Sequence, residues 1–215
     1  MRLSQGLRAA AGLDTLDPAN LPIGQFYQGG YFAGYISQTA NSTATHGLIV
    51  APKETGESSS LQWKTTTTTT SGTSSEYDGA ANTASMSNAN HPAANYCAGL
   101  TIDGYSDWYL PAPYELEIAY YNLKPTTESN DTNDGGNPYS VPERTEEYTA
   151  GNPTQTSVSI FQSGGSQAFV TASEYWTSMQ EGATFSYLFF FEDGSLDTGA
   201  NTESLYVRAF RKFAL

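Results

Sequence analysis

The chain has 215 residues, with 9 Lys+Arg against 22 Asp+Glu and a formal net charge of −13. So few basic residues disfavour binding to nucleic acid or to an anionic membrane, and no apolar run is long enough for a membrane helix. Aromatic residues make up 13% of the chain and charged residues 14%, which is typical of a folded, strand- and loop-rich protein rather than a disordered one.

Residues 1–20 are predicted to form an N-terminal arm for docking or assembly, followed by one domain over residues 21–215. Residues 4–13 could form a short helix that Asp17-Pro18 ends, but it is too short to be stable alone. A frayed terminus is the alternative. The arm lacks the apolar core of a signal peptide, and the single cysteine, Cys97, excludes an intrachain disulfide. Both features favour folding in a reducing cytoplasm.

The first part of the domain has the pattern of strands. Residues 24–37 interleave aromatic residues with glycines, and residues 45–53 contain the buried run Leu48-Ile49-Val50. Residues 54–60 are predicted to be a turn. The six threonines after Lys64 and the polar residues behind them are predicted to form an exposed loop.

Two helical regions follow. Residues 77–104 hold the first, with Asp78 and Asn82 as caps, Pro92 in a first turn and Cys97 as a small buried hydrophobe. The second begins after Pro111, is apolar over a wide face and ends at Pro125. Residues 126–156 are too polar for a core element and are predicted to be surface loop.

The last third of the chain again favours strands. They are predicted at residues 157–162, 174–180, 184–196 and 204–213, with a hairpin turn at Asp193-Gly194. Antiparallel strands with two helices and long loops make an α+β domain.

Catalytic and metal motifs are not evident. His46 and His91 lack metal-site or triad spacing, and there is no nucleophile elbow or phosphate loop. Asp131 and Asp134 could bind Ca²⁺ but lack the EF-hand pattern. We therefore predict no cofactor, no metal and no enzymatic activity.

Several short motifs occur in a characteristic order. They are Cys97, Gly104, Asp107-Trp108-Tyr109-Leu110-Pro111, Glu115-Leu116, Tyr175-Trp176-Thr177-Ser178, Asp193-Gly194 and Val207-Arg208-Ala209-Phe210-Arg211. In this order they resemble the domain family best known from the C-terminal head of a bacterial collagen-like adhesin. The resemblance implies a C-type-lectin-like fold used for adhesion or display. Related domains occur in phage tail-fibre and other virion proteins.

We interpret the central motif as a structural corner. Asp107 is expected to accept hydrogen bonds from loop backbone N–H groups, Trp108 to fill the core, Pro111 to start the helix and Glu115 to lie in its first turn, where the helix dipole favours an acid. Of the later motif residues, Trp176 is expected in the core, and two arginines are expected to pair with buried or half-buried carboxylates. These arginines are Arg208 and Arg211.

The resemblance leads to a functional expectation. We expect a phage virion structural protein, as a tail fibre, fibre tip or capsid decoration, that is made in the host cytoplasm and attaches to a host-surface glycan or protein. The arm is expected to bind other virion proteins, and a homo-oligomer, preferably a trimer, is expected. A bacterial cell-surface adhesin module is the alternative, and an enzyme on a lectin-like scaffold is the third reading.

The ligand is expected on the strand from residue 185 to 190. Phe185, Tyr187 and Phe189 alternate with Ser186, Leu188 and Phe190, so one side can face a ligand and the other the core. The alternatives are that both sides are core, or that residues 126–156 form the site. The predicted ligand-binding residues are Gln180, Glu181, Phe185, Tyr187, Asp197 and Asn201.

Overall fold

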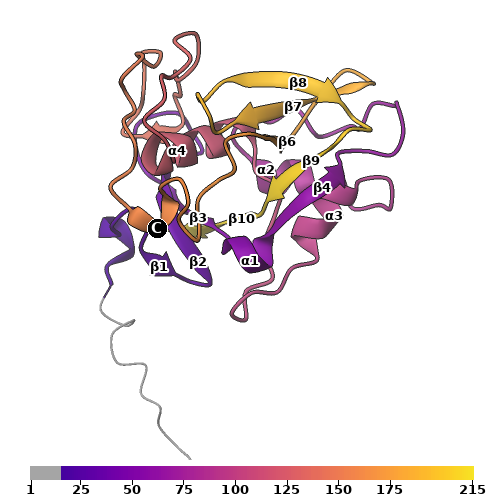
Figure 1. The fold of residues 1–215 in the computed structure, drawn as a ribbon. Coiled ribbons are helices and arrows are strands. Elements are labelled where there is room, and N and C mark those ends of the chain that lie inside the picture. The colour runs from indigo at the N-terminus through magenta and orange to yellow at the C-terminus, as the bar shows by residue number, and fades with distance from the viewer. Residues whose placement is uncertain (1–15) are drawn as a thin grey trace, which may run out of the picture.

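Two five-stranded sheets organise the chain, which the computed structural model describes over residues 16–215 (Figure 1). The strands are β1 (Phe26–Tyr27), β2 (Gly30–Ile36), β3 (His46–Val50), β4 (Glu57–Gln62), β5 (Ser140–Val141), β6 (Glu174–Glu181), β7 (Phe185–Phe190), β8 (Leu196–Ala200), β9 (Ser204–Arg208) and β10 (Phe210–Ala214). The helices are α1 (Lys53–Gly56), α2 (Gly79–Ala84), α3 (Pro92–Ala98) and α4 (Pro113–Leu123), with 3-10 turns at Pro18–Asn20 and Ser159–Phe161. The mixed, mainly antiparallel architecture confirms the α+β prediction.

The first sheet has the order β1-β2-β3-β10, and β5 pairs with the far end of β2. All of its pairs are antiparallel. Its central strand β3 is covered on both sides, because Leu48 and Val50 belong to one core cluster and Ile49 to the other. This double burial explains why the sequence of β3 is a continuous apolar run rather than an alternating one.

The second sheet has the order β4-β9-β6-β7-β8. Its strands pair antiparallel except β6 and β9, which are parallel. The predicted Asp193-Gly194 turn does join β7 to β8: Gly194 has a φ of +85°, and the Asp193 carboxylate accepts hydrogen bonds from the backbone N–H and hydroxyl of Ser195. A left-handed backbone there favours glycine.

Helix α4 packs between the two sheets. Leu116, Ala119 and Leu123 lie in one core cluster with residues of β2, β3, β6 and β7. The other cluster joins α3, including buried Cys97, to Trp108, Trp176 and the opposite face of the first sheet. The predicted burial of Cys97 and of both tryptophans is confirmed.

The start of α4 differs from the prediction. Pro111 does not start the helix, which begins two residues later at Pro113, because Ala112 precedes a proline and is extended, with a ψ of 162°. The Pro111 carbonyl instead accepts a hydrogen bond from the Ser178 N–H of β6. Similarly, Asp78 caps α2 by accepting from the Ala81 N–H, whereas Asn82 lies inside the helix and is not a cap.

Three strand or turn predictions were wrong because long-range contacts override the local pattern. Residues 54–60 form the end of α1 and most of β4 instead of a turn, and residues 157–162 contain a 3-10 turn instead of a strand. The predicted strand 204–213 is two strands that belong to different sheets and are separated by Ala209. The Ala209 N–H donates to the Gly56 carbonyl, and its own carbonyl accepts from the Ala51 N–H, which locks this crossover.

The segment 126–156 is more than surface loop. Its β5 extends the first sheet, and Asn130 and Tyr148 are buried. In Figure 1 its loops stand beside α4 at the upper left. A polar segment can therefore enter the core through a few residues.

The predicted N-terminal arm lies largely outside the described residues. Of its last residues, Pro18–Asn20 form a 3-10 turn capped by Asp17, and the Pro18 carbonyl accepts a hydrogen bond from the Tyr35 hydroxyl of β2. None of the helices within residues 16–215 has the length and apolar character needed to cross a membrane.

Candidate functional site

The corner motif is joined to the last strand by an ion pair. Asp107 accepts two hydrogen bonds from the Arg211 guanidinium of β10, at 2.7 and 2.9 Å, and Arg211 lies over the Tyr105 ring at 4.2 Å. The prediction that Asp107 accepts from loop N–H groups was wrong, because a bidentate arginine occupies both oxygens. The Asp107 side chain is 55% exposed and that of Arg211 is 6% exposed, so the carboxylate faces solvent while the arginine is buried.

The second arginine of the motif lies in the interior. Arg208 is fully buried, and its Nη1 lies 3.0 Å from the buried carboxylate of Glu57. Its Nε donates to the Ala51 carbonyl, and Nη2 donates to Gln167. The pairing expected for Arg208 is therefore present, and it ties β9 to β4 and to the segment before β6.

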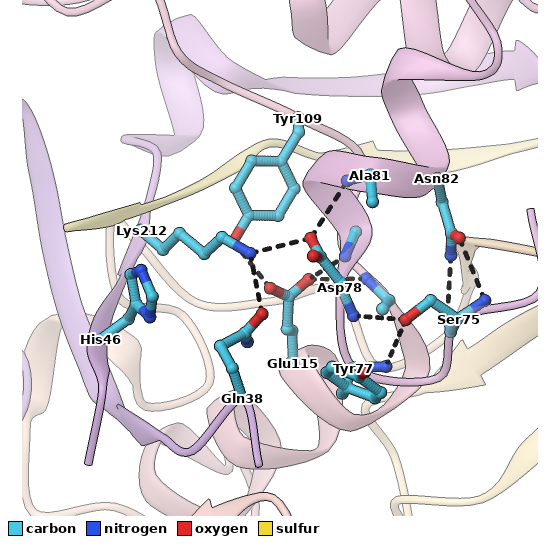
Figure 2. A network of polar contacts seen from close by, with 12 residues as sticks. Gln38, His46, Ser75, Tyr77, Asp78, Ala81, Asn82, Tyr109, Glu115 and Lys212 are labelled. Atoms are coloured by element: carbon cyan, nitrogen blue, oxygen red, sulfur yellow. Dashed lines mark hydrogen bonds and ion pairs between the residues drawn. The ribbon is translucent and has the colours of Figure 1, made fainter. Parts of the chain in front are cut away.

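Figure 2 shows a polar network around Glu115 that has the residue types of a catalytic site. Glu115 is fully buried, and its Oε2 accepts hydrogen bonds from the backbone N–H groups of Ala112 (2.8 Å) and Gly79 (3.1 Å). Its Oε1 accepts from the Tyr109 hydroxyl at 2.8 Å. Burial raises the pKa of Glu115 to about 7. Glu115 does lie in the first turn, as predicted, but it acts as a buried acceptor for three donors.

The rest of the network connects α2 to β10. Lys212 Nζ lies 2.8 Å from Asp78, the N-cap of α2, and donates to Gln38 at 3.4 Å (Figure 2). Both carboxylates of the network already have structural partners, and neither Glu115 nor Asp78 lines a cavity described here. We therefore interpret this network as a structural joint, in which Asp78, Glu115 and Lys212 hold α2, α4 and β10 together.

A pocket of about 380 Å³ lies on the other side of the α4 N-terminus. Its walls come from the first turn of α4, the segment after residue 132, and the strands β7 and β8. The lining residues are Glu76, Pro113, Tyr114, Glu117, Asn133, Asp134, Gly135, Gly136, Glu147, Met179, Tyr187, Phe189, Gly194 and Leu196.

Backbone and side-chain hydrogen bonds hold the pocket walls. Asp134 accepts from the Leu196 N–H of β8 at 3.1 Å, and its carbonyl accepts from the Tyr148 N–H at 2.7 Å. Gly135 has a φ of +112°, and a Cβ there would collide with the Tyr148 ring. This wall therefore requires glycine at position 135.

The pocket is acidic. Among residues 16–215, four carboxylates line it and no Lys or Arg does. Glu117 is buried and lies 3.1 Å from Arg144, which sits behind it over the Tyr121 ring at 4.5 Å. Burial raises the pKa of Glu117 to about 7, against the opposing effect of Arg144, and burial also raises the pKa of Asp134. The remaining polar side chains of the wall are the Asn133 carboxamide and the hydroxyls of two partly exposed tyrosines, Tyr114 and Tyr187.

The residues predicted to bind ligand divide between two faces of the second sheet. Tyr187 lines the pocket together with Phe189, which was not among the predicted residues, and the two lie opposite Thr198 and Leu196 of β8. Glu181 accepts a hydrogen bond from the Tyr187 hydroxyl at 2.9 Å. Phe185 shares their side but is 47% exposed and lies outside the lining.

Glu181 is also outside the lining, and the other three predicted residues do not reach the pocket, so Tyr187 is the one of the six predicted residues that lines it. Asp197 pairs with Leu188, on the opposite face of the sheet. Gln180 accepts from the Thr70 N–H and donates to the Thr68 carbonyl, and so anchors the threonine loop. Asn201 is buried and satisfied by Ser186 and the Ala183 carbonyl, which corrects its assignment to an exposed rim.

Sequence reasoning did not single out Tyr114 or Glu117 in the other wall of the pocket, and it kept residues 126–156, which include wall residues 133–136, only as an alternative site. The only signal was the length and polarity of the 126–156 segment. Within the part of the chain that the structure describes, no group of three or more His, Cys, Asp or Glu side chains could hold a metal ion. Asp131 accepts from Asn133, and His91 contacts Thr70 and Asn88, so both serve in loop structure.

The sequence matches no protein-family model, and no curated protein is significantly similar to it. The interpretation of the pocket therefore rests on its geometry and chemistry.

Proposed function

We propose that this protein is a phage virion structural protein, as a tail fibre, fibre tip or capsid decoration, with a C-type-lectin-like domain that attaches to a glycan on the host surface. The motif residues that suggested this fold support it, because each has a structural role. Asp107 pairs with Arg211, Trp108 and Trp176 fill the core, and Arg208 pairs with a buried glutamate.

The pocket between α4 and β7 is the observation that carries the glycan proposal. Sugar hydroxyls are hydrogen-bond donors, and the carboxylates of Glu76, Asp134 and Glu147 are strong acceptors. The rings of Tyr114 and Tyr187 offer apolar faces on which a sugar ring can stack. Because no basic residue lines the pocket, a neutral glycan suits it better than an anionic one.

The N-terminal arm, residues 1–20, is proposed to bind other virion proteins, and the domain to assemble as a homotrimer. A bacterial cell-surface adhesin would use the same pocket with a different attachment. Deleting residues 1–20 distinguishes the virion protein from the cell-surface adhesin. If the virion proposal is right, the truncated protein keeps its thermal midpoint but no longer incorporates into phage particles. Normal incorporation would contradict the role of the arm.

A glycan array with the purified full chain tests the pocket. Tyr114→Ala and Tyr187→Ala should each weaken binding about fivefold, since a ring stacked on a sugar contributes about 1 kcal/mol. Phe185→Ala is the matched control, because it removes an exposed ring from the same strand outside the pocket lining.

Unchanged binding by both tyrosine variants would contradict the proposal. So would a loss in Phe185→Ala as large as that in Tyr187→Ala. Cleavage of the bound glycan, abolished by Asp134→Asn, would instead indicate an enzyme built on the same scaffold.

A further inference from the structure

Lys124 and Asn130 bring an amine and a carboxamide together in the protein interior, outside the pocket. Lys124 directly follows α4 and is 1% exposed, and Asn130 is 6% exposed. Lys124 Nζ donates to Asn130 Oδ1 over 2.6 Å and also to the backbone carbonyls of Glu128 and Pro153. Among residues 16–215, no carboxylate lies within 4 Å of this Nζ. All of the hydrogen-bond partners of this lysine are therefore neutral, and the Glu128 and Asp193 carboxylates act on it only from beyond ion-pair distance.

The surroundings of Asn130 are arranged for attack on its side-chain carbonyl carbon. A C=O bond is about 1.23 Å long, so Nζ lies within about 4 Å of Cγ. The Tyr120 hydroxyl donates to Oδ1 at 2.7 Å and would stabilise negative charge that develops on this oxygen. The amide nitrogen donates to the carbonyls of Thr149 (2.8 Å) and Pro153 (3.0 Å), which fixes the plane of the carboxamide.

We propose that Lys124 and Asn130 condense to form an intramolecular isopeptide bond. The neutral amine of Lys124 attacks Cγ of Asn130, a C–Nζ bond forms, and the C–Nδ2 bond breaks. The proton lost by the attacking nitrogen goes to the departing nitrogen, which leaves as ammonia. The reaction needs no oxidant, reductant or co-reactant.

Two physical effects favour this reaction. Burial lowers the pKa of the Lys124 ammonium, which increases the population of the nucleophilic neutral amine. A buried cation without a counter-ion is also unfavourable, and acylation removes that charge. The product would connect the end of α4 to the segment that forms the 133–136 wall of the pocket.

Lys64 provides an internal control. It is also buried, with 4% exposure, and its Nζ donates to the Thr68 carbonyl and the Thr70 hydroxyl. No carboxamide accepts from Lys64 Nζ in the described structure, so it has no acyl group to attack. We expect Lys64 to remain a free amine.

Mass spectrometry of the purified full chain tests the bond. The intact mass should fall about 17 Da below that of the sequence, which is the mass of one ammonia. Glu128 lies between the two linked residues, so a glutamate-specific protease acting on the denatured protein should cut there without separating the fragments that carry Lys124 and Asn130. Lys124→Met and Asn130→Ala should abolish the mass loss, whereas Lys64→Met should retain it.

Wild-type protein with its full mass, whose two fragments separate after cleavage at Glu128, would overturn the proposal. A loss of about 17 Da that persists in Lys124→Met would also overturn it, because the ammonia would then come from another reaction, such as asparagine cyclisation.

Discussion

Glu115 and Glu117 lie two residues apart on α4, and both are buried, yet they belong to regions with different purposes. Burial raises the pKa of each to about 7. Glu115 accepts three hydrogen bonds from neutral donors inside the joint, whereas Glu117 has an arginine behind it and a pocket in front. Burial and a shifted pKa therefore do not by themselves identify a functional carboxylate. What distinguishes the two acids is that Glu117 lines an open pocket, whereas Glu115 does not.

The largest difference should appear when each carboxylate is removed. At pH 7, Glu115→Ala leaves the N–H groups of Ala112 and Gly79 and the Tyr109 hydroxyl without an acceptor, so we expect it to lower the free energy of unfolding by about 3–4 kcal/mol. Glu117→Ala should cost about 1–2 kcal/mol, because Arg144 keeps its contact with the Tyr121 ring beside an open pocket. Urea unfolding of the two variants checks this order, and equal losses would contradict the distinction between joint and pocket.

Stability should also depend on pH through the joint. The pKa of Glu115 is raised in the folded state from 4.5 to about 7, so the folded protein binds this proton more tightly than the unfolded chain does. Its contribution to stability is complete below pH 4.5 and is lost as the pH rises through 7, with a total change of roughly 3 kcal/mol.

Glu115→Gln is the matched variant for this pH dependence. Its oxygen can still accept from the backbone N–H groups, and its NH₂ can face the Tyr109 hydroxyl oxygen. We expect it to match the wild type near pH 5 and to be the more stable of the two at pH 8. Glu117 titrates over the same range, so the double Gln variant should lose the fall in stability between pH 5 and 8 and keep the rise from His91, whose pKa burial lowers to about 4. A Glu115→Gln profile that runs parallel to that of the wild type between pH 5 and 8 would contradict the assignment.

Asp107→Asn should have a smaller effect than either change in the joint. Arg211 is 6% exposed, but the carboxylate is 55% exposed and the asparagine oxygen can still accept from the guanidinium, so we expect a loss of about 1 kcal/mol. Arg211 also keeps its contacts with Gln28 and the Tyr105 ring. Thermal unfolding should shift by a few degrees at most. A loss as large as that of Glu115→Ala would show that the corner motif, rather than the joint, limits stability.

The smallest expected effect on stability is that of Phe185→Ala. The ring is 47% exposed and lies beyond the pocket lining, so the free energy of unfolding should change by about 0.5 kcal/mol or less. Calorimetry provides the measurement. A substantially larger loss would place this ring in the folded core and would remove it as a control for Tyr187.

Elements with strong local signals were predictable from the sequence. The apolar run of β3, the Asp193-Gly194 turn and the Asp78 cap were predicted correctly because neighbouring residues determine them. The division of residues 204–213 at Ala209 was not predictable, since contacts with Ala51 and Gly56 decide it. The same limit applies to the site. Tyr187 stood out by its alternation, but Glu117 and Asp134 join it only through the packing of α4 and the 126–156 segment against the second sheet.

Amide chemical-shift mapping during titration with a glycan selected on the array tests the central claim most directly. The claim predicts the largest shifts at the pocket walls, including the Leu196 amide that donates to Asp134, with little change at the Gly79 and Ala112 amides of the joint. Shifts that cluster instead on the Asp197 face of β8, or that spare Leu196, would contradict the assignment of the pocket as the binding site.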